Sequence, residues 1–287
     1  MKVGFSSLHP WSCFLFFASQ FCVLTASDHP AMLALAFLLA LACDLRFRGR
    51  EALKTLFAFY LPLALFCAAF NSIFSHYGVT PLFTLPGGNS YTLESLLYGL
   101  VFGVKLIVAL MWLDSFNVII TPEKFIFLFG RLSPRTALVV SMSLRFIPLF
   151  RQQSREISEA HYAAGAESKR FRLRLRHAVH NASILITWIL ERGIDTADSM
   201  AARGYGSGKR SRYSPYRFRA DDAAALALCA LFVLFAVLSR KAMSCAYNPV
   251  IRICAPDTVS LVFIALLVLS GAFPLIYDIT EKKRWKQ

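Results

Sequence analysis

Residues 199–210, with the sequence SMAARGYGSGKR, place three glycines and three basic residues within twelve positions. Glycine-rich loops that end in lysine can bind phosphate, so a phosphate-binding loop is the first possibility. That motif requires glycine at position 203 and a hydroxyl side chain at position 210, whereas this chain has arginine at both. The triplet Gly204-Tyr205-Gly206 also differs from a potassium-channel filter, because it lies in a basic segment rather than between two spanning helices. Both kinds of binding site are therefore excluded.

Two aspartates shortly before this stretch suggest a different chemistry. Asp195 and Asp198 stand three residues apart, as in the opening of the metal-binding motif of the CDP-alcohol phosphotransferases, which are integral membrane enzymes. Two further aspartates of that motif would fall at Tyr216 and Ala220, and Ser199 replaces a glycine of the motif. A site for a hard cation needs several oxygen ligands. We therefore expect no metal site, no catalytic residue and no cofactor, and keep a phosphotransferase only as the alternative function.

Cysteine and histidine residues show no zinc-binding spacing. The seven cysteines are scattered along the chain, and Cys245 and Cys254 share one predicted outer loop in which they could form a disulfide. His161, His177 and His180 fall in a basic region, and the 177/180 pair has no obvious third ligand. We interpret these three histidines as part of a solvated helix face.

The chain as a whole has the composition of a polytopic membrane protein. It has 287 residues, of which 56% are hydrophobic, and a mean hydropathy of +0.53. A spanning helix needs about 20 apolar residues. We predict an all-α fold with about six (five to six) spanning helices, of which the first two are short, and read Asp44 and Asp114 as solvated residues at span ends. The apolar runs are residues 12–26, 31–43, 55–75, 93–116, 223–238 and 258–277.

The basic residues predict which side of the membrane each segment faces. The net charge is +14, and lysine and arginine concentrate in residues 44–54, 121–220 and 281–287, whereas residues 76–92 contain none. Because cytoplasmic loops carry an excess of lysine and arginine, six spans would place all the strongly basic segments and the N-terminus in the cytoplasm.

The basic segment 121–220 is predicted to form three amphipathic helices. Thr121-Pro122-Glu123 has the residue types of a helix start, and this first helix should run to about residue 132. The second should span residues 136–164 with a kink at Pro148, and the third residues 173–202. The arginines at the start of the third helix suit anionic lipid headgroups. Nucleic acid is not an expected partner, since the basic residues are interleaved with amphipathic helices next to membrane spans.

The second and third of these helices end in similar sequences, Ala163-Ala164-Gly165 and Ala202-Arg203-Gly204. Small residues let another backbone approach closely, and an arginine at a helix end projects a planar group of five donors toward a carboxylate. The same arginine would also complement the negative end of its own helix, which is worth about 0.3–1 kcal/mol. For an isolated helix this second interpretation is favoured.

Taken together, these features resemble the transmembrane T component of energy-coupling-factor (ECF) transporters, the EcfT/CbiQ-type permeases. The resemblance covers most of the chain and is best from Thr121 to Tyr205. It rests on Thr121-Pro122-Glu123, on Ser143-Leu-Arg-Phe-Ile-Pro148 with the polar helix that follows, and on Met200-Ala-Ala-Arg-Gly-Tyr205.

The resemblance implies a non-catalytic coupling subunit in a bacterial or archaeal plasma membrane. Two ABC-type ATPase subunits would receive the two helix ends, and a small membrane S component would bind the transported vitamin or transition-metal ion. Arg203 would pair with an acidic residue of one ATPase, while Arg145 and Pro148 would have structural roles within the coupling helix. One departure concerns Ala164, which stands where the family places arginine, so one of the two ionic contacts is missing.

The resemblance also implies a division of the chain into three parts. Residues 1–120 would form the N-terminal membrane helices, residues 121–220 the cytoplasmic coupling region, and residues 221–287 the C-terminal membrane helices and a basic tail. The substrate would be selected by a separate chain. A membrane scaffold without ATPase partners is a further alternative.

Overall fold

The computed structural model describes residues 4–26, 29–74, 80–84, 90–130, 133–163, 171–208, 216–239 and 258–284. The chain divides into two compact units. The first, here called the membrane unit, comprises residues 1–125 and 216–287, and the second, here called the insert unit, comprises residues 126–215. The insert unit lies within the predicted coupling region 121–220, whose first five and last five residues belong to the membrane unit.

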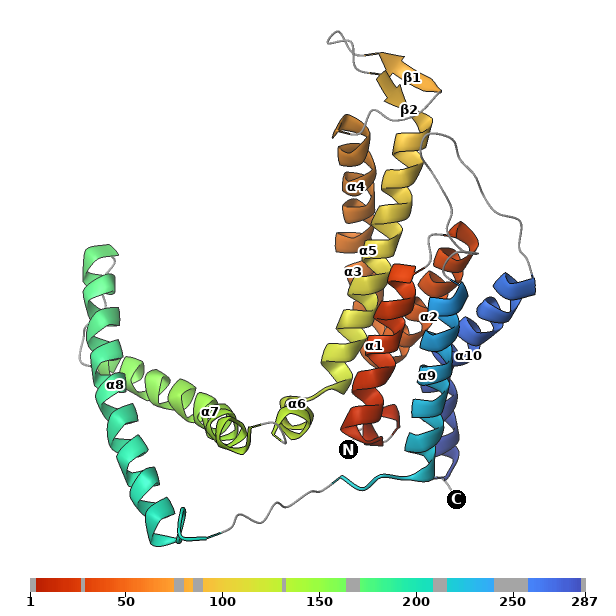
Figure 1. Cartoon of the computed structure of the whole chain (residues 1–287). Helices are drawn as coiled ribbons and strands as arrows, with labels where there is room; N and C mark the ends of the chain where they lie inside the picture. The colour runs from red at the N-terminus through yellow and green to blue at the C-terminus, as the bar shows by residue number, and fades with distance from the viewer. Residues whose placement is uncertain are drawn as a thin grey trace. The chain divides into compact units, whose positions relative to one another are not determined.

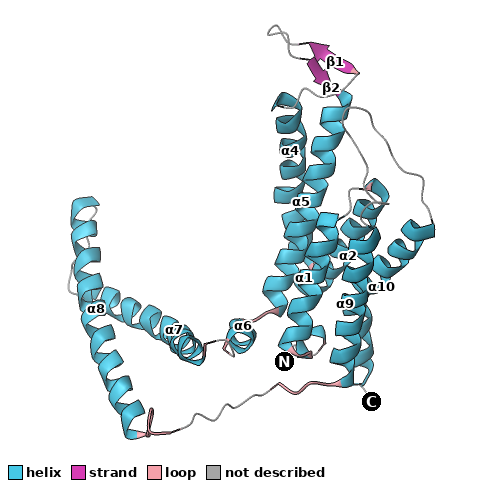
Figure 2. Ribbon diagram, viewed as in Figure 1, coloured by secondary structure: helices cyan, strands magenta, loops and turns pink. Residues whose placement is uncertain are grey.

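The membrane unit is a bundle of helices with one small β-hairpin (Figures 1 and 2). A single turn of 3₁₀-helix, η1 (Phe5–Ser7), precedes the first long helix, and a π-helical turn, η2 (Leu56–Tyr60), joins α3 to α4. The hairpin pairs β1 (Pro81–Thr84) antiparallel to β2 (Ser90–Thr92). The α-helices are α1 (Pro10–Ala26), α2 (Pro30–Arg48), α3 (Arg50–Thr55), α4 (Leu61–Phe74), α5 (Leu93–Ile119), α9 (Ala220–Ser239) and α10 (Thr258–Arg284).

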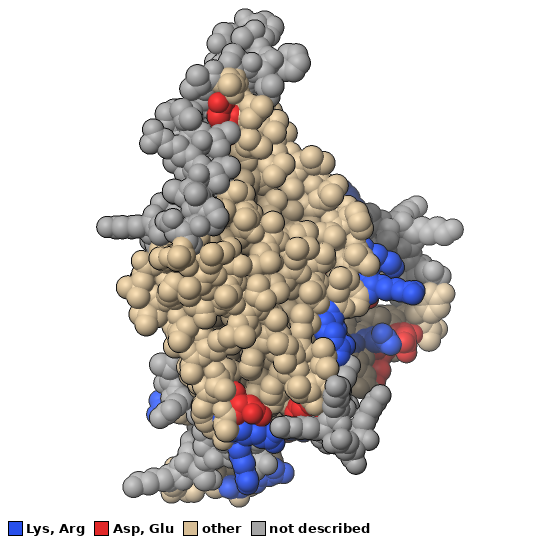
Figure 3. Space-filling view, turned by 90° about the vertical axis from the view of Figure 1, so that its right-hand side faces the viewer, with Lys and Arg blue, Asp and Glu red and all other residues tan. Residues whose placement is uncertain are grey.

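Five helices of the described chain are long and apolar enough to cross a membrane. They are α2, the continuous segment Arg50–Phe74, α5, α9 and α10, while the apolar part of α1, Pro10–Thr25, is shorter. The prediction of an all-α membrane fold with five to six spanning helices is therefore confirmed, with the hairpin as an addition. In Figure 3 an uncharged surface covers the middle of the visible face, and the charged side chains lie around its margins.

The first two helices begin with the same local signal, a His-Pro pair. Pro10 and Pro30 occupy the first turns of α1 and α2, where a missing N–H has no cost. The ring nitrogen Nδ1 of His29 accepts from the N–H of Ala31, and Nδ1 of His9 accepts from the N–H of Trp11, each at 3.3 Å. Each histidine thus satisfies a backbone donor that the helix leaves unpaired.

The second helix continues past its apolar run through charged residues, of which Asp44 is held inside the fold. Asp44 is fully buried, and Arg48 Nη1 lies 3.6 Å from its carboxylate. Arg48 also forms an ion pair with Asp114 of α5, which accepts a further hydrogen bond from the hydroxyl of Tyr60. The interpretation as a solvated boundary residue is therefore wrong for Asp44, whereas the side chain of Asp114 stays 31% exposed; both carboxylates lie against the one guanidinium of Arg48.

Close packing and aromatic contacts hold the bundle together. A side chain at Gly99 would lie 2.9 Å from Cα of Ala68, and one at Gly103 would lie 3.1 Å from Cα of Ala64, so α5 approaches α4 backbone to backbone. This use of small residues is typical of helix pairs in membranes. Trp112 of α5 makes edge-to-face contacts with Phe16 and Phe17 of α1, with ring centroids 5.8 and 6.1 Å apart.

The insert unit is built from helices close to those predicted for segment 121–220. Helix α6 (Pro122–Phe129) begins in the membrane unit, and α7 (Pro134–Ala163) and α8 (Phe171–Ala202) form the insert proper. Helix α7 continues through Pro148. The two long helices contact each other along part of their length, and Figure 1 shows α8 extending well beyond that contact to its C-terminal end.

Candidate functional site

The C-terminal end of α8 is closed by a Schellman motif centred on Arg203. The N–H of Gly204 donates to the carbonyl of Ala201 at 2.9 Å, and the N–H of Tyr205 donates to the carbonyl of Met200 at 3.0 Å. This pair of bonds requires a left-handed residue after the helix, and Gly204 has a φ of +79°. The glycine therefore ends the helix as predicted. Ala202, Arg203 and Gly204 are all exposed.

The predicted residues of α7 lie on that helix or just beyond it. Arg145 and Pro148 are exposed, and Pro148 removes one helical hydrogen bond, leaving the carbonyl of Leu144 without its usual donor. Ala163 is the last residue of α7 and is exposed. Ala164 and Gly165, the rest of the first predicted helix-end sequence, lie outside the described residues, as do Cys245 and Cys254.

A groove of about 590 Å³ between α7 and α8 brings Arg145 and Arg203 into one site. Arg192 is the third cation in its lining, and Asp195 is the one carboxylate there. The groove therefore carries an excess of positive charge on an apolar floor. The lining residues are Met142, Arg145, Phe146, Leu149, Trp188, Arg192, Asp195, Thr196, Ser199, Met200 and Arg203.

Aromatic contacts set the floor of this groove. The ring of Phe150 meets Trp188 edge to face, with centroids 6.2 Å apart, and stacks on Phe146 within its own helix at 5.6 Å. The guanidinium of Arg192 lies 5.3 Å from the centroid of the Trp188 ring, within the range of a cation–π interaction. Trp188 thus packs α8 against α7 and also orients one of the three groove arginines.

Of the groove residues of α8, Arg203 was predicted as a site residue, whereas Trp188, Arg192 and Ser199 were not identified from the sequence, although a signal was present. Trp188, Arg192, Asp195, Ser199 and Arg203 follow one another at intervals of three or four residues, which places them on one face of the helix. Which face meets α7 depends on the pairing of the two helices, and periodicity within a single helix does not contain that information.

The acidic and histidine candidates have different surroundings from those expected. Asp195 lines the groove together with the three arginines, and Asp198 is exposed. His161 of α7 lies beside the 177/180 pair, with ring centroids 6.3 Å from His177 and 5.4 Å from His180. The three histidines therefore come together from two helices, with His180 exposed and His161 and His177 half-buried. Within the described ranges, no group of three His, Cys, Asp or Glu side chains is placed to hold a metal ion.

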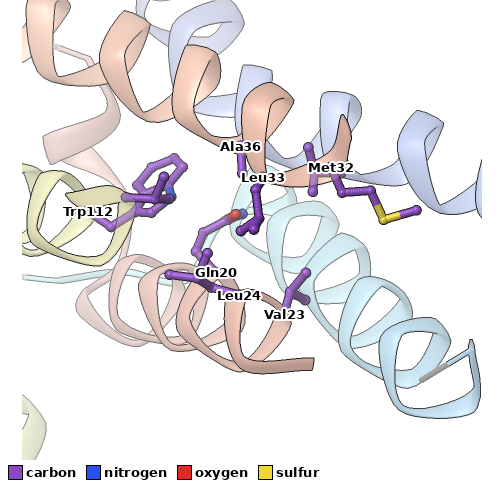
Figure 4. Close-up of a pocket in the computed structure, with 9 residues that line it drawn as sticks. Gln20, Val23, Leu24, Met32, Leu33, Ala36 and Trp112 are labelled. Carbon is purple, nitrogen blue, oxygen red and sulfur yellow. The ribbon is translucent and has the colours of Figure 1, made fainter. Parts of the chain in front are cut away.

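A cavity in the membrane unit is far smaller than the groove. It lies between α1, α2, α5 and α10, has a volume of about 20 Å³, and is lined mainly by apolar side chains such as Val23, Leu33 and Trp112 (Figure 4). Gln20 contributes an amide, whose Nε2 donates to Ser270 Oγ at 3.4 Å. This volume suits about one water molecule, so the cavity does not hold a vitamin-sized substrate.

Comparison with known proteins supports the architecture described above. A search of the curated proteins gives no match. The family model described as "CbiQ: Cobalt transport protein" matches residues 6–214, a range that runs from η1 through all three helices of the basic segment and past the end of α8. The chain therefore belongs to the CbiQ family of cobalt transport proteins, and is a multi-pass membrane component of a transporter.

Proposed function

We propose that this protein is the coupling subunit of an ECF-type importer. In this role it hydrolyses no ATP. Two ABC-type ATPases bind its insert unit from the cytoplasm, and their motion passes through α7 and α8 to the membrane helices, which act with a substrate-binding S component. The observation that supports this proposal best is the end of α8, where an exposed arginine is held in a defined helix terminus in a member of the CbiQ family.

The chemistry of that helix end suits an acidic partner. Arg203 offers a planar group with several donors, which pairs with carboxylates in two parallel hydrogen bonds. Arg145 and Arg192 line the same groove, so an acidic surface would meet additional positive charge there. Helix α8 has 32 residues and is about 48 Å long at roughly 1.5 Å per residue. A displacement at one end of such a rod can be transmitted over that length.

The transported substrate would be bound by the S component rather than by this chain. The family description names cobalt, which favours a transition-metal ion over a vitamin. The cavity of Figure 4 is lined mainly by apolar side chains and has room for about one water molecule, so it does not serve as a substrate site.

Anionic lipid headgroups are a second proposed contact of the insert unit. Arg172 and Arg176 at the start of α8 are exposed, at the opposite end of the helix from Arg203. Each basic residue near an anionic membrane surface contributes about 1 kcal/mol of attraction. The start of α8 would then stay near the membrane surface while its end meets the ATPase.

Co-purification with the ATPases tests the role of Arg203. Reversal of its charge in Arg203→Glu places like charges together, and we expect recovery of the ATPases to fall about ten-fold or more, together with uptake. Arg151→Glu is the matched control, because Arg151 is an exposed arginine of α7 that does not line the groove. Equal assembly and uptake by the Arg203→Glu and wild-type proteins would contradict this role. A wild-type preparation that never contains ATPases would favour a scaffold instead.

A further inference from the structure

The N-terminal segment Phe5–Cys13, which comprises η1 and the first turn of α1, is mostly buried although it lies near the start of the chain. Phe5 and Leu8 are 1% and 2% exposed, and Cys13 is fully buried. The same segment contacts the chain at both places where it connects the two units. The chain leaves the membrane unit after Phe125 and returns to it at Tyr216. The residues described below all belong to the membrane unit.

Lys124 anchors the outgoing connection. It lies in the first turn of α6, is only 4% exposed, and its Nζ donates to the carbonyl of Ser6 at 2.7 Å. Nζ also lies 4.0 Å from Sγ of Cys13. Burial lowers the pKa of Lys124 below its ordinary value. A buried ammonium is costly unless its hydrogen bonds are made, so the partners of Lys124 on the N-terminal segment fix the position of α6.

Asp222 anchors the returning connection to the same segment. It is 1% exposed in the first turn of α9, and its two carboxylate oxygens accept from different parts of the chain. Oδ2 accepts from the N–H of Arg219 at 2.9 Å, and Oδ1 accepts from the N–H of His9 at 2.8 Å. The His9 ring also meets Phe218 edge to face, with centroids 5.6 Å apart.

Tyr216, where the chain returns, also contacts the N-terminal segment, since its ring meets the His9 ring edge to face with centroids 6.4 Å apart. Burial raises the pKa of Tyr216, and the carboxylate of Glu123 in α6 raises it further. The turn η1 extends the arrangement to a third element, because Ser7 Oγ donates to Glu281 of α10 at 3.0 Å. One short segment therefore contacts the start of α6, the start of α9 and the end of α10.

We propose that residues 5–13 form a shared joint that transmits motion of the insert unit to the membrane helices, with Lys124 and Asp222 as its positioning residues. This inference rests on the proposed coupling function. Because both connections are fixed to one buried segment, a displacement of the insert unit moves the starts of α6 and α9 together. Without the joint, the connections would yield separately, and ATP hydrolysis would continue without transport.

The functional test uses the complete transporter reconstituted in vesicles. We expect Lys124→Met and Asp222→Asn to assemble with the ATPases and to hydrolyse ATP, while uptake per ATP hydrolysed falls about 5–150-fold, the usual range of coupling between sites. Lys124→Arg keeps the charge, so its uptake per ATP hydrolysed should lie between the values for Lys124→Met and the wild-type protein. Asp221→Asn is the matched control, since Asp221 is the neighbouring acid and is partly exposed. Unchanged uptake per ATP in Lys124→Met and Asp222→Asn would overturn the proposal.

Hydrogen exchange on the purified chain tests the joint without any ATPase. Lys124→Met should speed exchange in residues 5–13, where the partners of Lys124 lie. It should also speed exchange in residues 216–222, to which Lys124 makes none of the hydrogen bonds described above. Asp222→Asn should in turn speed exchange at the start of α6. Faster exchange confined to the substituted connection would show that the two are independent, and would overturn the joint whether or not the ATPases bind. If the joint passes this test but the wild-type chain binds no ATPases, the coupling function fails and the joint stands as a structural feature.

Discussion

Arg203 has a defined position because of the glycine that follows it. Gly204 has a φ of +79°, and the two Schellman hydrogen bonds depend on that conformation. Residues with a Cβ rarely adopt it, whereas glycine does so freely. The predicted ionic contact thus depends on an uncharged neighbour as much as on the arginine.

Two Gly→Ala substitutions in the same segment should have opposite effects. Gly204→Ala forces a side chain into the left-handed region at a cost of about 1–2 kcal/mol, so the end of α8 should fray. Gly193→Ala adds a methyl group that meets nothing within 4 Å in the middle of α8, and should stabilise the helix by about 0.5–1 kcal/mol. Hydrogen exchange of residues 198–205 would detect both changes. This account of the helix end would be contradicted if exchange became faster in Gly193→Ala. It would also be contradicted if the exchange rate in Gly204→Ala did not rise.

His9 makes the N-terminal segment sensitive to acid. Burial lowers the pKa of His9, while the nearby Asp222 opposes the shift. Because the unfolded chain then binds a proton more readily than the folded one, stability should fall as pH drops below about 6.5, the ordinary histidine value. Melting temperatures between pH 7.5 and 5.5 would show this loss, and His9→Gln should reduce its slope. The same dependence of melting temperature on pH in the wild-type and His9→Gln proteins would contradict this role of His9.

At the scale of elements, the contacts between helices decide which surfaces can act. The groove exists because α7 and α8 pack through Phe150 and Trp188, and α4 and α5 approach closely because Gly99 and Gly103 lack side chains. In the membrane unit such contacts replace the hydrophobic effect as the main source of specificity between helices.

Enlargement of Gly103 should separate α4 from α5. A side chain there would lie 3.1 Å from both Cα and the carbonyl oxygen of Ala64, and backbone cannot move aside as a flexible side chain can. Gly103→Leu should therefore destabilise the protein by about 1–3 kcal/mol, as overpacking does. Phe102→Leu is the control, since Phe102 is 51% exposed on the same helix. Thermal unfolding in detergent measures both, and equal melting temperatures would refute the close contact.

The sequence predicted elements better than the contacts between them. As far as the structure describes them, the six apolar runs are helical, and the three helices of segment 121–220 appear within a few residues of their predicted ends. Apolar length and proline or glycine signals act locally, so they can be read along the chain. The burial of Asp44 and Lys124 was not predicted, because a charge at a helix end looks solvated until its partner from another element is known.

At the scale of the whole molecule, the helices that can cross a membrane and the exposed basic surface proposed to bind partners come from different parts of the chain. The spanning helices come from residues before 120 and after 219, and the insert unit between them has exposed arginines and an arginine-lined groove. The basic segments predict a cytoplasmic location for that insert by the excess of lysine and arginine. Under the proposed coupling function, this surface is the one that would receive energy from the ATPase chains.

The central claim, that α7 and α8 receive ATPase motion, can be tested by a distance measurement within the insert unit. Spin labels can be attached at Tyr162, near the end of α7, and at Ser207, just after α8, because both positions are exposed. The native cysteines are replaced first, so that only these two positions are labelled. In the complete complex, ATP should shift the distance distribution between the labels, and the isolated chain should show no such shift. An unchanged distribution in a complex that hydrolyses ATP and takes up substrate would contradict the account.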